Sequence, residues 1–409
     1  MFVTTLSGNH YTYERKSNMI VEGIHIEKIT AAKIIRPKFF HEMLHVNTFV
    51  VCVTTMCNLR CSYCCYSGKY RHNRTHGNQS FSIQDFDELI VFVSILSPNN
   101  YIHIIFYGGE CLLDFNNIAS FVDKAIKTWP KRVRFSISTN GTLLQPSIID
   151  WCVKYRVVLN ISIDGLQRTH DLYRKTKDNQ GSFMKIYRIL IDIRSRYPSF
   201  FKENVNLLLT ITDISLLTQI ALEWQRDDLL SYKAPAHISL VEPNFQQGIE
   251  KTDEQEIWNI YDEMLQTYSQ HTENVVFKSF FQQEISRWEK RNICQLEEEC
   301  PIPICIPWNQ KLYIDIDGGI GLCEKTCDNL RIGNIKTGID WQKANQVAQD
   351  LYDLRLQRCS MCPIIRVCDI CPVELDLERE EMDIYCHNKI VNFKLKLWLL
   401  CEMAERGLL

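Results

Sequence analysis

The sequence predicts an α/β fold built on a parallel sheet, with a cysteine-rich domain after it. From residue 47 onward, apolar runs typical of strands alternate with helical segments in six βα units. Continuous apolar strands are typical of a parallel sheet that helices cover on its faces. The 18 cysteines of the 409 residues are unevenly placed, with five in 52–65 and eleven from 294 onward. This distribution indicates a first site, a scaffold and a second cysteine-rich domain.

The first part of the chain alternates strands and helices in a regular order. Strands are expected at 48–54, 101–107, 133–138, 157–163, 204–211 and 236–241. Helices between them are expected at 82–96, 115–128, 146–155, 182–196 and 214–226. In parallel α/β folds ligands bind at the carboxyl ends of the strands. The polar segments that follow these strands are therefore the candidate site.

Five segments are expected along the whole chain. They are an amino-terminal hairpin extension at 1–46, the strand–helix domain at 47–245, a helical connector at 246–293, a cysteine-rich domain at 294–390 and a carboxyl-terminal helix at 391–409. The connector is expected to hold two helices, and the terminal helical pattern begins near residue 388. The cysteine-rich domain is expected to be poor in long periodic elements.

Composition argues against nucleic-acid and membrane partners. The net charge is −3 and the pI is about 6.4, so no global basic field attracts a phosphate backbone. No apolar stretch reaches the roughly 18 residues that a membrane span needs. The first residues lack a basic region followed by an apolar core, so we expect no signal peptide and a cytoplasmic location. Clustered cysteines in such a chain indicate metal rather than disulfides.

Three cysteines follow the first strand directly. Cys57, Cys61 and Cys64 have the spacing Cys-x3-Cys-x2-Cys, with Tyr63 before the third of them and Cys65 after it. Four-iron clusters take four cysteine ligands, so three thiolates leave one iron open to a ligand that is not protein. The motif, including Tyr63 as a cofactor-binding position, resembles the cluster loop of the radical S-adenosylmethionine (SAM) enzymes. The spacing of the motif favours Cys64 over Cys65 as the third ligand. The alternative to a cluster motif is that this spacing arose by chance.

The segment that ends the second strand extends the resemblance. Gly108 and Gly109 let the backbone approach a ligand closely, and Glu110 offers an acceptor for an ammonium group. The segment is similar to the one that binds the methionine amino group of SAM in this family, where Pro usually stands in place of Cys111. A simple turn is the alternative.

Polar residues also end the third and fourth strands. Ser138 and Asn140 resemble the family's polar positions on the ribose side of SAM, although Asn140 followed by Gly is also an ordinary turn. Ser162 and Arg174 match the branch of the family that carries a SPASM domain. There the two residues contact the SAM carboxylate, which suits the bidentate fork of arginine. A surface helix charge is the alternative for Arg174.

The resemblance implies a fold and a chemistry. The six βα units would close into a partial (β/α)6 barrel, which is two units short of a full one. A [4Fe–4S] cluster would bind SAM through its open iron. Reductive cleavage would then give a 5′-deoxyadenosyl radical that takes hydrogen from an unactivated carbon, with the protein supplying position and a dry pocket.

The cysteines of the last third resemble a SPASM domain, which carries two auxiliary [4Fe–4S] clusters and would bring the total to three. The resemblance assigns an outer cluster to Cys359, Cys362, Cys368 and Cys386. It assigns an inner cluster to Cys300, Cys305, Cys323 and Cys371, with Cys294 and Cys327 as spare candidates. The interval before Cys371 has two residues where the family has three. Two zinc sites are the alternative, because four-cysteine spacing of this kind also suits zinc.

Glu324 directly follows Cys323. The related anaerobic sulfatase maturases hold a catalytic Asp at that position. Glu324 could therefore act as a base toward the substrate, and a solvent-facing acid is the alternative.

The function that the resemblance favours is that of a ribosomal-peptide maturase. Its partners would be a precursor peptide and an electron donor of the flavodoxin or ferredoxin type. The leader of the peptide would bind to the amino-terminal hairpin, to a sheet edge by strand addition, or to a separate protein. An anaerobic sulfatase maturase, which makes formylglycine, is the second hypothesis. A non-catalytic iron–sulfur electron-transfer protein is a third, from a different class.

Overall fold

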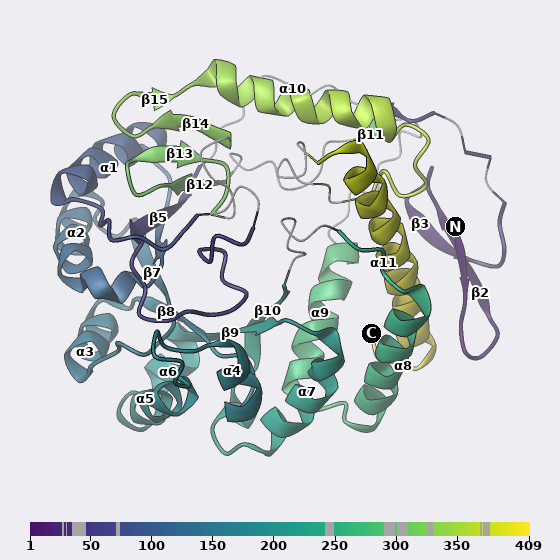
Figure 1. Cartoon of the computed structure of the whole chain (residues 1–409), viewed down its shortest axis with the longest axis horizontal. Helices are drawn as coiled ribbons and strands as arrows, with labels where there is room; N and C mark the ends of the chain where they lie inside the picture. Colours follow the sequence, from purple (N-terminus) through teal and green to yellow (C-terminus); the bar gives the residue numbers. More distant parts are fainter. Residues whose placement is uncertain are drawn as a thin grey trace. The chain divides into compact units, whose positions relative to one another are not determined.

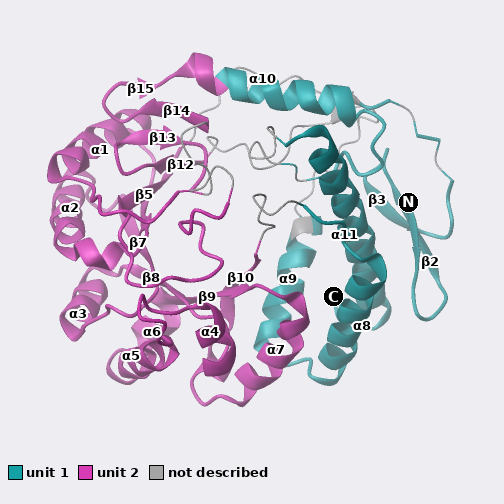
Figure 2. Cartoon of the chain, viewed as in Figure 1, with its two compact units in different colours: residues 1–39, 247–306, 345–409 teal, residues 40–246, 307–344 magenta. Residues whose placement is uncertain are grey.

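The computed structural model describes residues 1–26, 28–29, 31–34, 46–70, 74–241, 249–289, 299–300, 310–324, 330–368, 370 and 377–409. The chain divides into two compact units (Figure 2). The first unit comprises 1–39, 247–306 and 345–409, and the second comprises 40–246 and 307–344.

The second unit is built on the six parallel strands that the sequence predicts. They are β5 (Thr48–Thr54), β6 (Ile102–Gly108), β7 (Val133–Thr139), β8 (Val158–Ser162), β9 (Val205–Ile211) and β10 (Pro235–Leu240). Each pairs in parallel with the next in chain order. The predicted strands are confirmed, because no predicted end differs from the observed one by more than one residue. Their carboxyl ends therefore lie along one edge of the sheet, as the site prediction requires.

The expected helices lie on the outer side of this curved sheet (Figure 1). They are α1 (Ile83–Leu96), α2 (Phe115–Thr128), α3 (Pro146–Tyr155), α5 (Phe183–Arg196) and α7 (Leu217–Arg226). Local sequence explains several helix starts: Ser82 and Asp85 form a capping box at α1, and Pro146 is the first residue of α3. Two short helices that the sequence did not predict are α4 (Gln167–Tyr173) and α6 (Pro198–Asn204). The described residues of this unit also form three 3-10 turns, η2 (Cys111–Asp114), η3 (Ile214–Leu216) and η4 (Leu230–Tyr232).

The sheet continues beyond β5 with strands from much later in the chain. β12 (Lys311–Ile314) pairs in parallel with β5. β13 (Gly319–Gly321), β14 (Arg331–Asn334) and β15 (Gly338–Ile339) then follow as antiparallel neighbours. Among the described residues the sheet thus has ten strands. Residues that the sequence analysis put in the cysteine-rich segment therefore build the edge of the main sheet.

The first unit combines a small sheet with long helices. β1 (Phe2–Thr4), β2 (His10–Glu14) and β3 (Met19–Glu22) form an antiparallel sheet, and β4 (Lys33–Ile34) pairs with β11 (Glu299–Cys300). The helices are α8 (Glu254–Gln270), α9 (Val275–Glu289), α10 (Trp341–Arg358), whose first residues belong to the second unit, and α11 (Arg379–Glu405). Tyr13, Trp288 and Phe393 meet in its core, with ring centroids 4.9 to 6.2 Å apart. The sheet of β1, β2 and β3 lies within the expected amino-terminal extension, and α8 and α9 lie within the expected connector.

The expectation that 294–390 lacks long elements is wrong. α10 has 18 residues within this range, and α11 begins at Arg379 rather than near 388. The buried face of α10 in the first unit consists of Ala348, Leu351 and Arg355. Ala348 is small and Arg355 is charged. Large apolar residues therefore do not recur regularly along this segment, and that recurrence is the pattern from which a helix is predicted.

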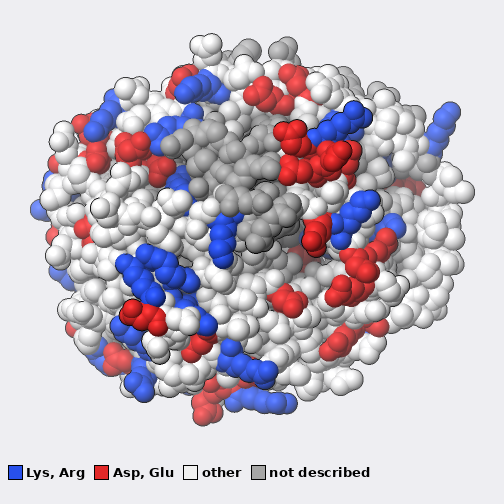
Figure 3. Space-filling model, viewed as in Figure 1, with Lys and Arg blue, Asp and Glu red and all other residues white. Residues whose placement is uncertain are grey.

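On the face in Figure 3, acidic and basic side chains are interspersed over the described residues. In the parts of the chain that the structure describes, we find no helix that combines the length and the apolar character of a membrane span.

We predict that His103 makes stability depend on pH. Burial first, and Arg134 second, lower the pKa of His103 to about 4, and its Nε2 lies 2.7 Å from the Ser136 hydroxyl. An unfolded histidine has a pKa of about 6.5, so the unfolded chain binds more protons between these values. The free energy of unfolding should therefore fall as the pH drops from about 6.5 toward 4. His103→Gln should reduce that fall in urea titrations at pH 7.5 and 5.5.

The matched control for this experiment is His271→Gln. His271 is exposed at the end of α8, so its replacement should leave the pH dependence as in the unmodified protein. Equal pH dependence in His103→Gln and the unmodified chain would show that the buried imidazole has no part in it.

Candidate functional site

The three predicted cluster cysteines lie on the loop between β5 and α1. The backbone N–H of Leu59 donates to the sulfur of Cys57, and that of Tyr66 donates to the sulfur of Cys64, both at 3.4 Å. Cys57, Cys61 and Cys64 are half-buried and are not in disulfides. Backbone donors of this kind stabilise sulfur in its charged form. At Cys57 the N–H of Leu59 opposes the effect of burial, which raises the pKa of that thiol to about 11.

This cysteine loop is held by backbone hydrogen bonds on two sides. Gly109 N donates to Thr54 O at 2.8 Å and Glu110 N to Met56 O at 2.7 Å. On the other side, Arg60 N donates to Lys175 O at 2.7 Å and Ser62 N donates to Tyr173 O at 3.0 Å. The loop is thus fixed between the end of β6 and the end of α4.

Gly108 and Gly109 are required by this contact. Gly108 has a φ of +134°, and a Cβ there would lie 2.4 Å from the carbonyl oxygen of Thr54. A Cβ on Gly109 would lie 2.1 Å from the carbonyl oxygen of Met56. Neither distance is possible against backbone atoms, so a side chain at either position would displace the cysteine loop.

Glu110 is fully buried, and its carboxylate binds protein donors. Oε1 accepts from Leu112 N at 3.1 Å and from the Thr139 hydroxyl at 2.7 Å, while Oε2 accepts from Asn140 N at 2.7 Å. Burial raises the pKa of Glu110, although these three donors act in the opposite direction. In this arrangement the carboxylate joins the ends of β6 and β7.

Asn140 connects the end of β7 to the cysteine loop. Its Nδ2 donates to Asn58 Oδ1 at 2.9 Å, and its Oδ1 accepts from the backbone N–H of Thr142 at 2.9 Å. Asn58 Nδ2 in turn donates to the Thr142 hydroxyl at 2.8 Å. Ser138 and Ser162 are half-buried near the carboxyl ends of β7 and β8. The predicted polar positions are therefore all brought to the edge of the sheet where the cysteine loop lies.

Arg174 is buried in contact with the aromatic residue of the cysteine motif. Its Nη1 donates to the Tyr63 hydroxyl at 2.7 Å and lies 3.7 Å from Asp164 Oδ2, to which that hydroxyl donates. Asp164 Oδ1 accepts from Thr210 N at 3.0 Å. Arg174 Nε is buried without a hydrogen-bond partner. A surface role for Arg174 is therefore wrong, and one of its donors remains available to a ligand.

Two residues that the sequence analysis did not single out fix this ion pair. His170 is fully buried, and burial holds its pKa well below the usual value, so the ring is neutral. Its Nδ1 accepts from Asp164 N at 3.1 Å, and its Nε2 lies 3.0 Å from the Ser182 hydroxyl, which donates to Arg174 O at 2.9 Å. Their place in the sequence was a signal, because both residues lie within eight positions of Arg174, which the resemblance assigned to the SAM carboxylate.

Arg74, a half-buried arginine of the segment between β5 and α1, contacts β12, which lies between β5 and β13 in the sheet. The guanidinium of Arg74 lies 4.2 Å from the ring centroid of Tyr313, with Nε 3.3 Å from both carboxylate oxygens of Asp315. Its Nη1 donates to the carbonyl of Glu324 at 2.9 Å. These contacts bring the hairpin of β12 and β13 against the cysteine loop within the second unit.

Glu324 forms an ion pair with Lys311, with Nζ 2.8 and 3.0 Å from its two carboxylate oxygens. Burial raises the pKa of Glu324, but the charge of Lys311 outweighs it, and the pKa lies below its ordinary value. A carboxylate paired in this way is a weaker base than a free one. The side chain is about one quarter exposed, so it is not a freely solvated acid either.

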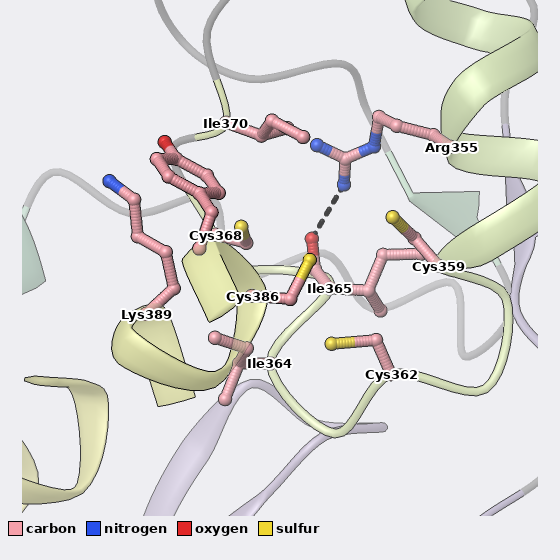
Figure 4. A pocket seen from close by; sticks show the side chains of 10 residues that line it. Arg355, Cys359, Cys362, Ile364, Ile365, Cys368, Ile370, Cys386 and Lys389 are labelled. Atoms are coloured by element: carbon pink, nitrogen blue, oxygen red, sulfur yellow. Dashed lines mark hydrogen bonds between the residues drawn. The ribbon is translucent and has the colours of Figure 1, made fainter. Parts of the chain in front are cut away.

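Four cysteines of the first unit line one cavity together with Arg355. Figure 4 shows the sulfur atoms of Cys359, Cys362, Cys368 and Cys386 around one space, with the guanidinium of Arg355 at its edge. Burial raises the pKa of the Cys359 thiol to about 11, and Arg355 opposes that shift. The residues that the sequence assigned to an outer cluster are thus brought together.

The residues assigned to an inner cluster are only partly described. Cys323 lies beside Glu324 and donates its S–H to Oε2 at 3.4 Å, while Cys300 is on β11. Cys305, Cys371, Cys294 and Cys327 lie outside the described residues. Among the described residues, no three His, Cys, Asp or Glu side chains are close enough to hold a single metal ion.

Comparison with known proteins finds a family model that matches part of this chain. The model of the Radical SAM superfamily matches residues 51–216. The radical SAM cyclopropyl synthase TigE of Paramaledivibacter caminithermalis is 27% identical over 196 residues, which cover 46% of this chain and 39% of that protein. The serine-type anaerobic sulfatase-maturating enzyme of Bacteroides thetaiotaomicron is 31% identical over 185 residues, covering 37% of this chain and 42% of that protein. The chain thus spans about two fifths of the length of these curated relatives.

A solved structure shares the fold over most of the chain. Native anSMEcpe with bound AdoMet and Cp18Cys peptide superposes with a TM-score of 0.61 and 15% identity, covering 88% of this chain and 98% of that chain. At this identity the likeness concerns the fold, and it confirms the predicted α/β class. The family model confirms the resemblance inferred from the cysteine loop.

We predict that the buried pair of Asp164 and Arg174 matters far more for stability than an exposed one. Asp164→Asn would leave the guanidinium buried without its counter-charge, which should lower the free energy of unfolding by about 3 kcal/mol. Asp150→Asn is the matched control, because it removes the 2.7 Å ion pair with Arg196 at a solvent-exposed position. Its effect should be much smaller, since water screens that pair. Anaerobic urea titrations would measure both, and similar losses would contradict the prediction.

Proposed function

Residues 51–216 form a radical SAM domain, and on this premise we propose that the chain is a radical SAM peptide maturase. The observation that carries the proposal is the cysteine loop, which backbone hydrogen bonds from Gly109, Glu110, Arg60 and Ser62 fix at the carboxyl edge of the parallel sheet. A loop held on both sides can keep three thiolates in a fixed arrangement. Two of the relatives are named as a radical SAM cyclopropyl synthase and as a serine-type anaerobic sulfatase-maturating enzyme.

The described residues fit a [4Fe–4S] cluster with SAM on its open iron. Cys57, Cys61 and Cys64 would be the ligands, since their sulfurs are free of disulfides and two of them accept backbone N–H groups. The unpartnered, buried Nε of Arg174 supports its assignment to the SAM carboxylate. When bound and reduced, the cluster and SAM supply a 5′-deoxyadenosyl radical that takes hydrogen from an unactivated carbon.

The remaining residues of the proposed SAM site would shape the site and hold its parts in place. We assign Tyr63, Gly108, Gly109, Glu110, Ser138, Asn140 and Ser162 to it. Gly108 and Gly109 supply backbone near the loop, while the buried carboxylate of Glu110 holds the ends of β6 and β7 together. Because Glu110 already accepts three protein hydrogen bonds, we propose backbone carbonyls of this segment as additional acceptors for the SAM ammonium.

We further propose two auxiliary [4Fe–4S] clusters, which would make three in all. The outer one would use Cys359, Cys362, Cys368 and Cys386, which line one cavity. The inner one would use Cys300, Cys305, Cys323 and Cys371. A buried cation beside four thiols supports a negatively charged occupant of the outer cavity. A single zinc ion held by four thiolates is the alternative, but no three of the described side chains lie close enough together for one metal ion.

The proposed substrate is a ribosomally made precursor peptide, and the product a crosslink, a thioether or a similar modification. The peptide is supported by the solved structure of the same fold that holds a peptide. Glu324 would serve as a base only after separation from Lys311. We also propose a flavodoxin- or ferredoxin-type electron donor and a cytoplasmic location, which the free thiols of the described cysteines favour.

An anaerobic sulfatase maturase is the second candidate function. The identity to the Bacteroides thetaiotaomicron enzyme favours it, while Glu324 in place of the expected Asp weakens it. Gene neighbourhood separates the two, because a maturase of small peptides would be encoded beside a short precursor and a sulfatase maturase beside a sulfatase.

We predict that the cysteine loop is needed for SAM cleavage. The full chain would be reconstituted anaerobically with iron and sulfide, then assayed with dithionite and SAM for 5′-deoxyadenosine. The unmodified protein should hold about twelve irons, the sum of three four-iron clusters, and release deoxyadenosine. Replacing Cys57, Cys61 and Cys64 together by Ala should abolish deoxyadenosine and leave about eight irons.

Cys65→Ala is the matched control, because Cys65 is adjacent to Cys64 and lies 3.7 Å from the Tyr107 hydroxyl. It should retain deoxyadenosine formation, whereas Cys64→Ala alone should lose it. Deoxyadenosine from the triple variant would falsify the assignment of the loop. About four irons in the unmodified protein, with zinc present, would remove the auxiliary clusters while leaving the radical SAM site.

A further inference from the structure

The cavity lined by Cys359, Cys362, Cys368 and Cys386 has a buried arginine in its wall. Arg355 lies on α10 and is only 1% exposed, which places it among the largest fully buried side chains of the described residues. It follows Ala348 and Leu351 on the buried face of the helix. The position that an apolar residue would normally take is therefore occupied by a guanidinium.

Only part of this guanidinium is hydrogen-bonded within the chain. Nη2 donates to the carbonyl of Ile365 at 2.7 Å, the contact drawn in Figure 4. Nε and Nη1 are buried and have no hydrogen-bond partner. Side chains seldom leave two such donors buried without an acceptor, because the loss of water costs about 1–3 kcal/mol for each group and more for charged ones.

The charge of Arg355 also lacks a counterpart among the described residues that line the cavity. No acidic residue is among the described residues that line the cavity. A guanidinium keeps its proton in proteins, so it cannot escape the cost of burial by becoming neutral. An isolated buried charge is expected only where an opposite charge comes close. The arrangement therefore calls for an anionic acceptor inside the cavity.

We propose that Arg355 is the cationic partner of the outer auxiliary cluster and raises its reduction potential. This inference rests on the proposed function, which puts a four-iron cluster on these four cysteines. Four thiolates give such a cluster net negative charge, and its sulfurs accept the free Nε–H and Nη1–H of Arg355. Cluster potentials depend on net charge, hydrogen bonds to sulfur and solvent exposure.

The direction of the effect follows from electrostatics. Reduction adds one electron and so makes the cluster more negative. A fixed cation in a buried site stabilises the reduced form more than the oxidised form, because the interaction is weakly screened there. The outer cluster is therefore a better electron acceptor with Arg355 than without it.

If Arg355 has only a structural role, its replacement should change the iron content and not the reduction potential. If the side chain served only to hold the carbonyl of Ile365, its removal would loosen the loop that carries Cys362 and Cys368 and reduce the iron content. It would not move the potential of the clusters that still form. The potential and the iron content together therefore separate the two roles.

The test is an anaerobic redox titration followed by electron paramagnetic resonance. The full chain would carry Cys57→Ala, Cys61→Ala and Cys64→Ala, so that only auxiliary clusters contribute. Arg355→Met should shift the midpoint potential of one auxiliary cluster to more negative values at unchanged iron content. Arg355→Lys keeps the charge and loses the guanidinium fork, so its shift should be smaller. Arg379→Met removes the same charge from an exposed position at the start of α11 and should leave the potential unchanged.

Each result decides the question. A negative shift in Arg355→Met that exceeds those of Arg355→Lys and Arg379→Met supports the proposal. Unchanged potentials with full iron content overturn it, and loss of the cluster from both Arg355 variants would show a folding residue instead. An unmodified protein without auxiliary iron signals would refute the cluster itself, an outcome that differs from an unmoved potential.

Discussion

The site depends on the close backbone contact between the cysteine loop and the end of β6. Gly109 and Glu110 donate their N–H groups to the carbonyls of Thr54 and Met56. Because a Cβ at Gly108 or Gly109 would collide with those carbonyls, the contact exists only with glycine at both positions. This contact fixes where the cysteine loop lies relative to the polar side chains at the ends of the strands. The strand ends bring polar groups to one edge, and the glycines bring the cysteines within reach of them.

A buried arginine lies close to each of the two groups of cysteines. Arg174 bonds to Tyr63, between two cysteines of the motif, and is balanced by Asp164. Arg355 lines the cavity of the second group, which has no acid among its described residues. The electrostatic surroundings of the two sites thus differ. In the first, a carboxylate neutralises the cation, and one nitrogen remains for a ligand. In the second, the cation lines the cavity without a counter-charge among the described residues of its wall.

Local signals in the sequence were sufficient for the parallel strands and for the cysteine loop. Apolar runs defined β5 to β10, although only β5 is buried at almost every position, while β6, β8 and β9 alternate buried and half-buried residues. The pairing of β12 with β5 could not be predicted, since it joins distant parts of the chain through a strand of only four residues. α10 was missed because Arg355 stands in its buried face. The positioning roles of His170 and Ser182 depend on hydrogen bonds that spacing does not specify, and the ligands assigned to an inner cluster remain predictions.

The place of β12 in the sheet has a consequence for biosynthesis. β5 leads directly into the cysteine loop, and one of its two edges pairs with β12. On the ribosome that edge remains unpaired until the chain has grown past Ile314, because β12 is among the last strands of the sheet to be made. An apolar strand with an open edge is prone to pair with other chains. Cells that produce this protein at high levels would therefore gain from a chaperone that shields β5, and slower translation would lengthen the period of risk.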